Sequence, residues 1–137
     1  MTGLMVCVAV LVAASVFGLL HTRRSGRLKV RGRDDSRWLG AADLGTELGA
    51  RATLVQFSSA FCQPCRATRR TLADVAGMVA GVAHVELDAE ENLSLVRELG
   101  IMKTPTVLVL DRQGRVVRRA AGQPRKADVI AALGEAV

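Results

Sequence analysis

The stretch Ser58-Ser59-Ala60-Phe61-Cys62-Gln63-Pro64-Cys65-Arg66 decides the fold of this 137-residue chain. An apolar run, residues 53–57, comes directly before it. The segment that follows, residues 66–79, has apolar side chains at helical spacing. The sequence therefore predicts a strand, a tight turn and a helix, with both cysteines at the start of the helix.

The two cysteines can form a disulfide and reopen it, because one helical turn brings their side chains within bonding range. At the expected N-cap, Cys62 would lie beside unsatisfied backbone N–H groups and the positive end of the helix dipole, which favour a thiolate. We therefore expect Cys62 to be the nucleophile and Cys65, further inside, to be the resolving thiol. Pro64 fits the first helical turn because it has no N–H to leave unsatisfied.

A static disulfide and half of a metal site are the alternatives for this pair. A zinc site normally needs four protein ligands, or three and a water molecule. The third cysteine, Cys7, lies in an apolar N-terminal run, and neither His21 nor His84 has ligand spacing with the pair. The motif beside a strand–helix unit instead favours redox exchange. We expect no metal and no organic cofactor, with the Cys62–Cys65 disulfide as the redox group.

The N-terminal run, residues 3–20, has no charged residue and only Ser15 as a clearly polar side chain. Its length reaches the lower end of what a bilayer span needs. No Lys or Arg precedes it and no convincing small-residue cleavage site follows, which argues against a cleaved signal peptide. We expect residues 1–22 to be a single-pass transmembrane anchor. A signal peptide and a buried helix of a soluble protein are the alternatives.

The positive charge of the chain is concentrated just after this run. Residues 21–33 carry six basic residues and no acid, and the chain from Asp34 onward has thirteen residues of each sign, so the formal charge of +6 arises in this segment. A globular part without a basic surplus argues against nucleic-acid binding. We interpret residues 23–37 as a basic juxtamembrane linker that could contact anionic lipid headgroups. A merely solvated linker is the alternative.

The same charges bear on which side of the membrane the globular part lies. Basic residues follow the apolar run and none precedes it, a distribution that favours keeping the C-terminal flank in the cytoplasm. We therefore expect the redox domain on the cytoplasmic face of the cell membrane. The extracytoplasmic face stays open, since one CxxC motif is compatible with either compartment.

The rest of the chain alternates between helical and strand patterns. We expect helices at residues 38–48, 92–99 and after Pro124, and strands at residues 82–88, 106–110 and 115–120. The last two strands are joined by a turn at residues 111–114. Strands separated by helices, then a hairpin and a terminal helix, predict an α/β domain over residues 38–137. Its centre would be a mixed sheet with helices on both faces.

With these elements in place, residues 38–137 resemble the thioredoxin family. The residues that carry the resemblance are the strand ending at Phe57, the CxxC motif, the strand ending at Asp88, and Gly100-Ile101-Met102-Lys103-Thr104-Pro105-Thr106 before a hairpin and a helix. The resemblance implies a thioredoxin-like fold preceded by one transmembrane helix. It implies a thiol–disulfide oxidoreductase whose substrates are protein disulfides or thiols, with an electron donor or acceptor that the sequence does not identify.

The resemblance also assigns substrate-binding residues. It implies that Pro105 is cis and lies beside the CxxC, which would present the backbone of Thr104 to an extended substrate segment. A trans-proline at the start of a strand is the alternative. Around the cysteines, Phe61, Gln63 and Pro64 would complete the surface. Phe61 replaces the usual tryptophan and keeps an apolar rim, whereas Gln63 replaces the usual glycine.

One departure from the family pattern concerns proton transfer. Gln56 lies where the family has a buried aspartate that helps to move the proton of the resolving cysteine, and glutamine does not titrate. His84 matches a neighbouring lysine, and alternation places it on one strand face with Glu86 and Asp88. We hypothesise that His84 or a water molecule relays the proton of Cys65, since imidazole titrates near neutral pH. A partly exposed polar residue without a role is the alternative.

Two other functions stay open at this point. One is a thioredoxin-fold binding or assembly module whose CxxC is structural or holds a metal. The other is an oxidase or isomerase, because the redox potential decides the direction of exchange.

Overall fold

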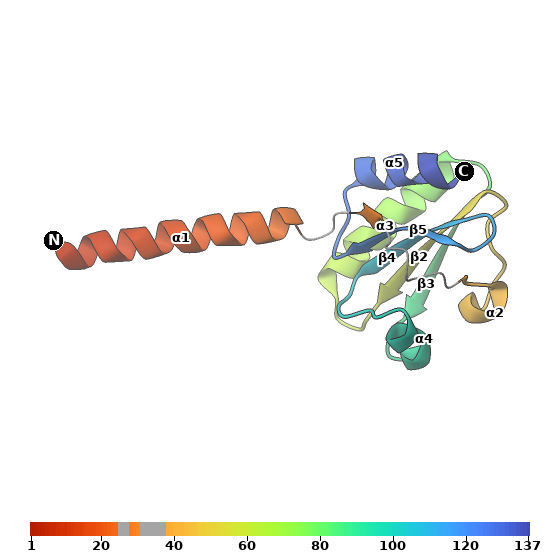
Figure 1. The fold of residues 1–137 in the computed structure, drawn as a ribbon, viewed down its shortest axis with the longest axis horizontal. Coiled ribbons are helices and arrows are strands. Elements are labelled where there is room, and N and C mark those ends of the chain that lie inside the picture. Colours follow the sequence, from red (N-terminus) through yellow and green to blue (C-terminus); the bar gives the residue numbers. More distant parts are fainter. Residues whose placement is uncertain (25–27, 31–37) are drawn as a thin grey trace.

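A computed structural model describes residues 1–24, 28–30 and 38–137 of the chain (Figure 1). The elements follow in the order α1 (Thr2–Arg24), β1 (Lys29–Val30), α2 (Ala41–Leu44), β2 (Ala52–Ser58), α3 (Gln63–Met78), β3 (Val82–Asp88), α4 (Leu93–Glu98), β4 (Thr106–Asp111), β5 (Val116–Ala121) and α5 (Lys126–Ala136). The predicted order of elements from β2 to α5 is confirmed, with boundaries that shift by a few residues at most.

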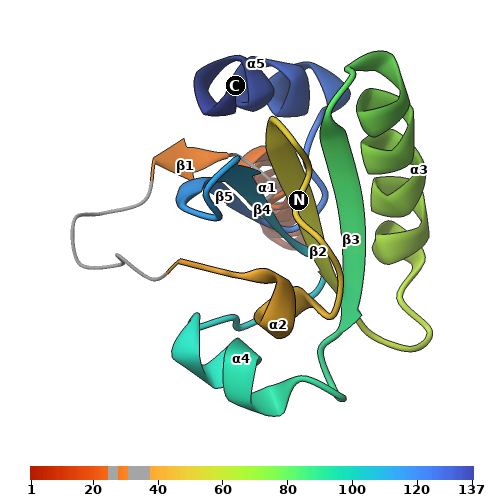
Figure 2. The ribbon, with the colours of Figure 1, turned by 90° about the vertical axis from the view of Figure 1, so that its right-hand side faces the viewer.

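The sheet is mixed, as the sequence predicts. Its strand order is β1-β5-β4-β2-β3. β2 and β3 are parallel, whereas β4 runs antiparallel to β2, β5 antiparallel to β4, and β1 antiparallel to β5. Helices α3 and α5 cover one face and α2 and α4 the other, so the expectation of helices on both faces is also confirmed (Figure 2).

Strand β2, which lies between β4 and β3, is buried along its whole length. On one face Leu54 belongs to the apolar cluster beneath α3 and α5, which includes Leu72 and Val129. On the other face Phe57 belongs to the cluster beneath α2 and α4. β2 is therefore held between two apolar clusters, and it ends with Ser58 at one end of the sheet. We call this end of the domain, where β2 ends and α3 begins, the redox end.

The predicted helix over residues 38–48 is wrong in length, since only Ala41–Leu44 is helical. Trp38 instead forms an isolated bridge with Arg115, and the N–H of Leu39 donates to the carbonyl of Gly114 at 2.9 Å. These bonds hold the start of the segment against the β4–β5 hairpin in an extended conformation. The helix then ends at Gly45, which adopts a φ of 70° that favours glycine.

Helix α1 contains the apolar N-terminal run. It is 23 residues long, and its 18-residue apolar stretch has a mean hydropathy of 2.6 with none of it buried, so by length and composition it could cross a membrane. Within the predicted linker, residues 29–30 form the edge strand β1, while residues 25–27 and 31–37 lie outside the described part. The division into an anchor, a linker and a domain stays a prediction.

Candidate active site

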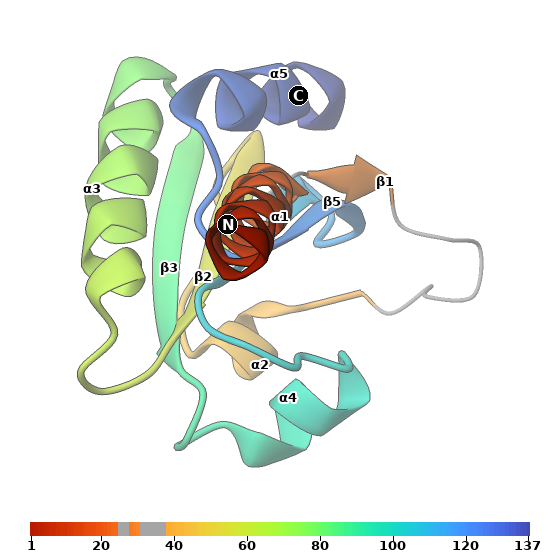
Figure 3. The same ribbon diagram turned by 90° about the vertical axis from the view of Figure 1, so that its left-hand side faces the viewer.

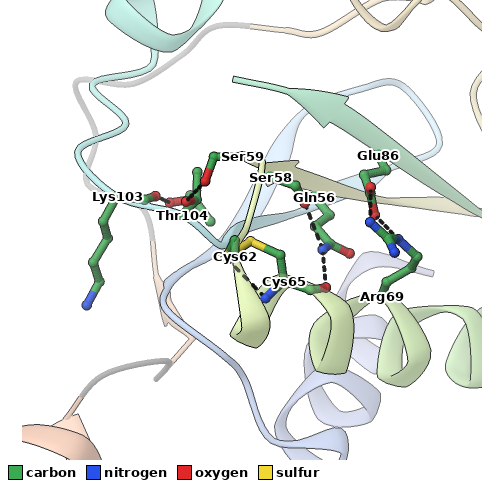
Figure 4. Close-up of a disulfide and its surroundings, with 10 residues drawn as sticks. Gln56, Ser58, Ser59, Cys62, Cys65, Arg69, Glu86, Lys103 and Thr104 are labelled. Atoms are coloured by element: carbon green, nitrogen blue, oxygen red, sulfur yellow. Dashed lines mark hydrogen bonds and ion pairs between the residues drawn. A yellow bond between two sulfur atoms is a disulfide. The ribbon is translucent and has the colours of Figure 1, made fainter. Parts of the chain in front are cut away.

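The turn between β2 and α3 places the CxxC motif at the redox end (Figure 4). Cys62 is the N-cap of α3, and Pro64 lies in the first turn of that helix, as the sequence predicts. Phe61, just before Cys62, has a φ of 60° in the left-handed region, which non-glycine residues seldom adopt. Its side chain is fully exposed. The turn therefore holds an apolar side chain out beside the first cysteine.

The two cysteines form a disulfide with a Cα–Cα distance of 5.2 Å. Cys65 is 1% exposed, whereas Cys62 is only partly buried. The backbone N–H of Cys65 donates a hydrogen bond to the sulfur of Cys62 at 3.2 Å. A donor aimed at this sulfur favours its anionic form, as does the N-terminus of the helix. The more accessible sulfur is thus also the one on which negative charge is stabilised.

The loop before β4 lies against the CxxC turn. The Thr104–Pro105 peptide bond is cis, as the resemblance implies. The hydroxyl groups of Ser59 and Thr104 are 2.8 Å apart and share a hydrogen bond, which joins the two loops directly (Figure 4). A cavity of about 560 Å³ is lined by Pro64, Thr104 and Pro105, among others. Three of the predicted substrate-binding residues therefore meet around one hollow.

Phe61 and Gln63 are both exposed on the CxxC turn, and they do not line this cavity. Both side chains are accessible to a visiting chain. The five predicted substrate-binding residues therefore lie on the CxxC turn and on the loop before β4.

Gln56, near the end of β2, lies next to the disulfide (Figure 4). It is fully buried, and its Nε2 donates to the Ser58 hydroxyl at 2.9 Å and to the Cys65 carbonyl at 2.8 Å. His84 Nε2 lies 3.2 Å from Gln56 Oε1 and must donate, because an amide oxygen only accepts. These bonds lead from His84 to the backbone of Cys65, not to a sulfur.

The ion pair between Arg69 and Glu86 borders His84 and was missed by the sequence analysis. Arg69 Nε and Nη2 donate to the two carboxylate oxygens of Glu86, each at 2.6 Å. Strand alternation placed Glu86 on the face of His84, but no local pattern indicates that α3 brings Arg69 to it. The hydrogen bond with Glu86 and its charge raise the pKa of Arg69.

The pKa of His84 is lowered from 6.5, mainly because burial penalises the charged ring. The charge of Glu86 opposes this shift and that of Arg69 adds to it. His84 is therefore neutral at pH 7, which suits a group that could accept a proton.

Comparison with known proteins places the chain in a family. The family model for thioredoxin matches residues 43–135. The chain belongs to the thioredoxin family. A thioredoxin from Alicyclobacillus acidocaldarius is 34% identical over 88 residues, which cover 64% of this chain and 83% of the relative. A thioredoxin from Mycolicibacterium smegmatis is 28% identical over 91 residues, covering 64% and 80%. Spinach chloroplast thioredoxin f superposes with a TM-score of 0.56 at 27% identity, covering 64% and 78%.

Membership of the thioredoxin family and the disulfide-bonded CxxC together support thiol–disulfide oxidoreductase activity. The match begins after α1, so the relatives do not test the role of that helix. In the described ranges, no group of three or more His, Cys, Asp or Glu side chains could hold a metal ion.

Proposed function

We propose that the protein is a membrane-tethered thiol–disulfide oxidoreductase that reduces or exchanges disulfides in partner proteins. One observation carries the proposal. The two cysteines differ in their surroundings. Cys62 is partly exposed, and the N–H of Cys65 donates a hydrogen bond that would stabilise the Cys62 thiolate, whereas Cys65 itself is buried. A static disulfide needs no such difference, whereas a nucleophile and a resolving thiol do.

In the reduced protein, the Cys62 thiolate attacks one sulfur of a target disulfide. A mixed disulfide forms, and the displaced target sulfur leaves as a thiolate that takes up a proton. Cys65 then loses its proton, and its thiolate attacks the Cys62 sulfur. The second target sulfur leaves, so the target gains two electrons and two protons while Cys62 and Cys65 become oxidised. A donor dithiol must return the two electrons for the next cycle.

Substrate positioning follows from the loop of Pro105. In this proposal an extended segment of the target pairs with the backbone of Thr104, in the manner of an added strand. Phe61, Gln63 and Pro64 contact the same segment from the CxxC turn. Main-chain hydrogen bonds do not depend on the side chains of the target, so this arrangement suits exchange with several partners.

The proton of Cys65 needs an acceptor, and we propose His84, acting through a water molecule, for this role. Gln56 orients the imidazole and the Cys65 backbone through its hydrogen bonds but does not titrate. Replacement of His84 by Gln should slow the resolving step and change its pH profile. Unchanged reduction rates and an unchanged profile in this variant would remove His84 from the mechanism.

For localisation we propose a single-pass protein of the cell membrane, anchored by residues 3–20, with the domain on the cytoplasmic side. The basic flank supports this orientation, and anionic headgroups are its natural contact. A topology reporter fused after Val137 tests the assignment. Reporter activity typical of the outer compartment would reverse the orientation and change the class of electron donor.

The activity itself is tested by insulin reduction with dithiothreitol as the electron donor. Cys62→Ser should abolish turnover, and Cys65→Ser should accumulate a mixed disulfide with the target, because the resolving thiol is missing. Cys7→Ser is the matched control, since Cys7 is a free, exposed cysteine on α1, and should leave turnover unchanged.

Full activity of Cys62→Ser would refute the proposal. So would a lack of turnover in the wild type together with stoichiometric metal after anaerobic purification, which would favour a binding or assembly module. The equilibrium potential against glutathione then separates a reductase from an oxidase or isomerase.

A further inference from the structure

The chain enters the domain from the redox end. β1 pairs antiparallel with β5, with Lys29 opposite Arg119. Leu28 therefore lies toward the C-terminal end of β5. That end adjoins the active-site loop, because the N–H of Gly122 donates to the carbonyl of Pro105 at 2.7 Å. The N-terminal end of β1 thus lies at the same end of the sheet as the cis-proline.

The connection between α1 and the domain is short. Helix α1 ends at Arg24, and Leu28 already packs against the apolar cluster beneath α3 and α5. Four Cα–Cα steps separate these residues, which span at most about 14 Å when fully extended. The last residue of α1 therefore lies within that distance of Leu28.

The structure agrees with this covalent limit. Figures 1 and 3 show α1 leaving the domain at the end where β2 ends and α3 begins. Thr22, in the last turn of α1, lines the same cavity as Pro64, Thr104 and Pro105. The C-terminal end of α1 thus lines the same hollow as the cis-proline loop and Pro64, which lies next to Cys65 in the chain.

The side chains at the redox end suit a position at a membrane surface. The charged residues that line the cavity, Lys103, Arg125 and Lys126, are all basic. Basic side chains at a bilayer surface are attracted to anionic headgroups. The two most exposed large apolar side chains within residues 38–137 are Phe61 at 101% and Met102 at 92%, and both belong to the loops around the disulfide.

We propose that the redox pair faces the bilayer surface, and that its substrate is a cysteine pair in an extended segment of a membrane protein, within a few residues of the bilayer. This inference rests on the proposed function and names the substrate class for the same site. The exchange step is the one given above, with the donor dithiol supplying two electrons. A cysteine pair far from the membrane would have to bend back toward the lipid to reach Cys62.

Fluorescence quenching tests the orientation. The full chain is placed in vesicles of phosphatidylcholine and phosphatidylglycerol that contain a headgroup spin-labelled lipid. Trp38 is the only tryptophan and is half exposed, and its bridge to Arg115 places it at the end of the sheet opposite the redox end. The double variant Trp38→Phe/Phe61→Trp moves the probe to the redox end.

We expect several-fold stronger quenching in the double variant than in the wild type. Insertion of a flexible Gly-Ser spacer after Arg24, of about twenty residues and hence a mean reach of about 25 Å, should abolish the difference. Equal quenching at the two positions, or stronger quenching of Trp38, would overturn the proposed orientation.

Substrate choice is tested with two synthetic transmembrane peptides that carry the same disulfide loop, close to the span in one and behind a long flexible linker in the other. The wild type should reduce the close disulfide several-fold faster than the remote one. The spacer variant should lose that preference several-fold, because its site is no longer confined near the surface. Reduction of the remote disulfide alone by the wild type would overturn the inference.

Soluble insulin separates this inference from the proposed function. If the wild type and the spacer variant reduce insulin equally while the close disulfide is spared, the oxidoreductase function holds and only the membrane-facing substrate class fails. If neither protein reduces insulin or either peptide, the proposed function itself fails.

Discussion

The hydroxyl groups of Ser59 and Thr104 lie 2.8 Å apart and join two loops that are 45 residues apart in the sequence. Ser59 precedes the CxxC turn, and Thr104 precedes the cis-proline. The bond therefore fixes the spacing between the nucleophile and the backbone that is proposed to hold the substrate.

Removal of this bond should impair substrate positioning more than the chemistry of the cysteines. Thr104→Val keeps the β-branched shape but lacks the hydroxyl, and should cost about 1 kcal/mol of unfolding free energy. We expect KM for insulin to rise in this variant while the Cys62 thiol keeps its reactivity toward a small alkylating agent. Ser94→Ala, an exposed serine on α4, is the control. Equal KM values for Thr104→Val and the wild type would contradict the prediction.

Gln56 should contribute to stability through its two donated hydrogen bonds. Gln56→Leu keeps a similar volume but leaves the Cys65 carbonyl and the Ser58 hydroxyl without this donor, at a cost of about 1–3 kcal/mol. Urea unfolding of the oxidised protein, followed by the fluorescence of Trp38, measures the change. An unchanged free energy of unfolding in Gln56→Leu would contradict this prediction.

The two members of the ion pair beside His84 should shift the pKa of its imidazole in opposite directions. Glu86→Gln removes a charge that raises the pKa of His84 and should lower it further. Arg69→Gln removes a charge that lowers this pKa and should raise it. NMR titration of the ring protons measures both shifts, with His84→Gln to assign the resonances. Shifts of the same sign in the two variants would contradict the electrostatic account.

Neutral His84 should make the protein less stable in acid. Its folded pKa lies below the ordinary 6.5, so as the pH falls through 6.5 the unfolded chain binds a proton that the folded chain does not. The free energy of unfolding then decreases until the folded pKa is passed. We expect the stability of the wild type relative to His84→Gln to be lower at about pH 5 than at about pH 8. A pH-independent difference between the two proteins would contradict this.

Replacement of two glycines by alanine should change the stability of the protein in opposite directions. Gly114 has a φ of 90°, and an added Cβ would lie 2.1 Å from the Leu39 carbonyl oxygen, so Gly114→Ala should cost about 1–3 kcal/mol. Gly77 lies within α3 with nothing within 4 Å of an added Cβ, and Gly77→Ala should gain about 0.5–1 kcal/mol. Thermal unfolding of the two variants measures both, and a stabilising Gly114→Ala would be inconsistent with the close approach.

The sequence by itself determined the local features of this protein. The N-cap position of Cys62, the first-turn position of Pro64, the order of elements from β2 to α5 and the membrane-compatible length of α1 all follow from neighbouring residues. Capping, periodicity and hydrophobic length act over one or a few turns of chain, so they can be recognised without knowing what packs against them.

Only the tertiary structure decided the contacts between distant segments. The pairing of Leu39 with Gly114 shortened a helix that the apolar spacing favoured, and the ion pair of Arg69 depends on how α3 lies across β3. The antiparallel register of Lys29 on β5 brings the N-terminal end of β1 to the same end of the sheet as the disulfide. Each of these contacts joins residues whose separation in space is set by packing on the sheet, and no local pattern encodes that separation.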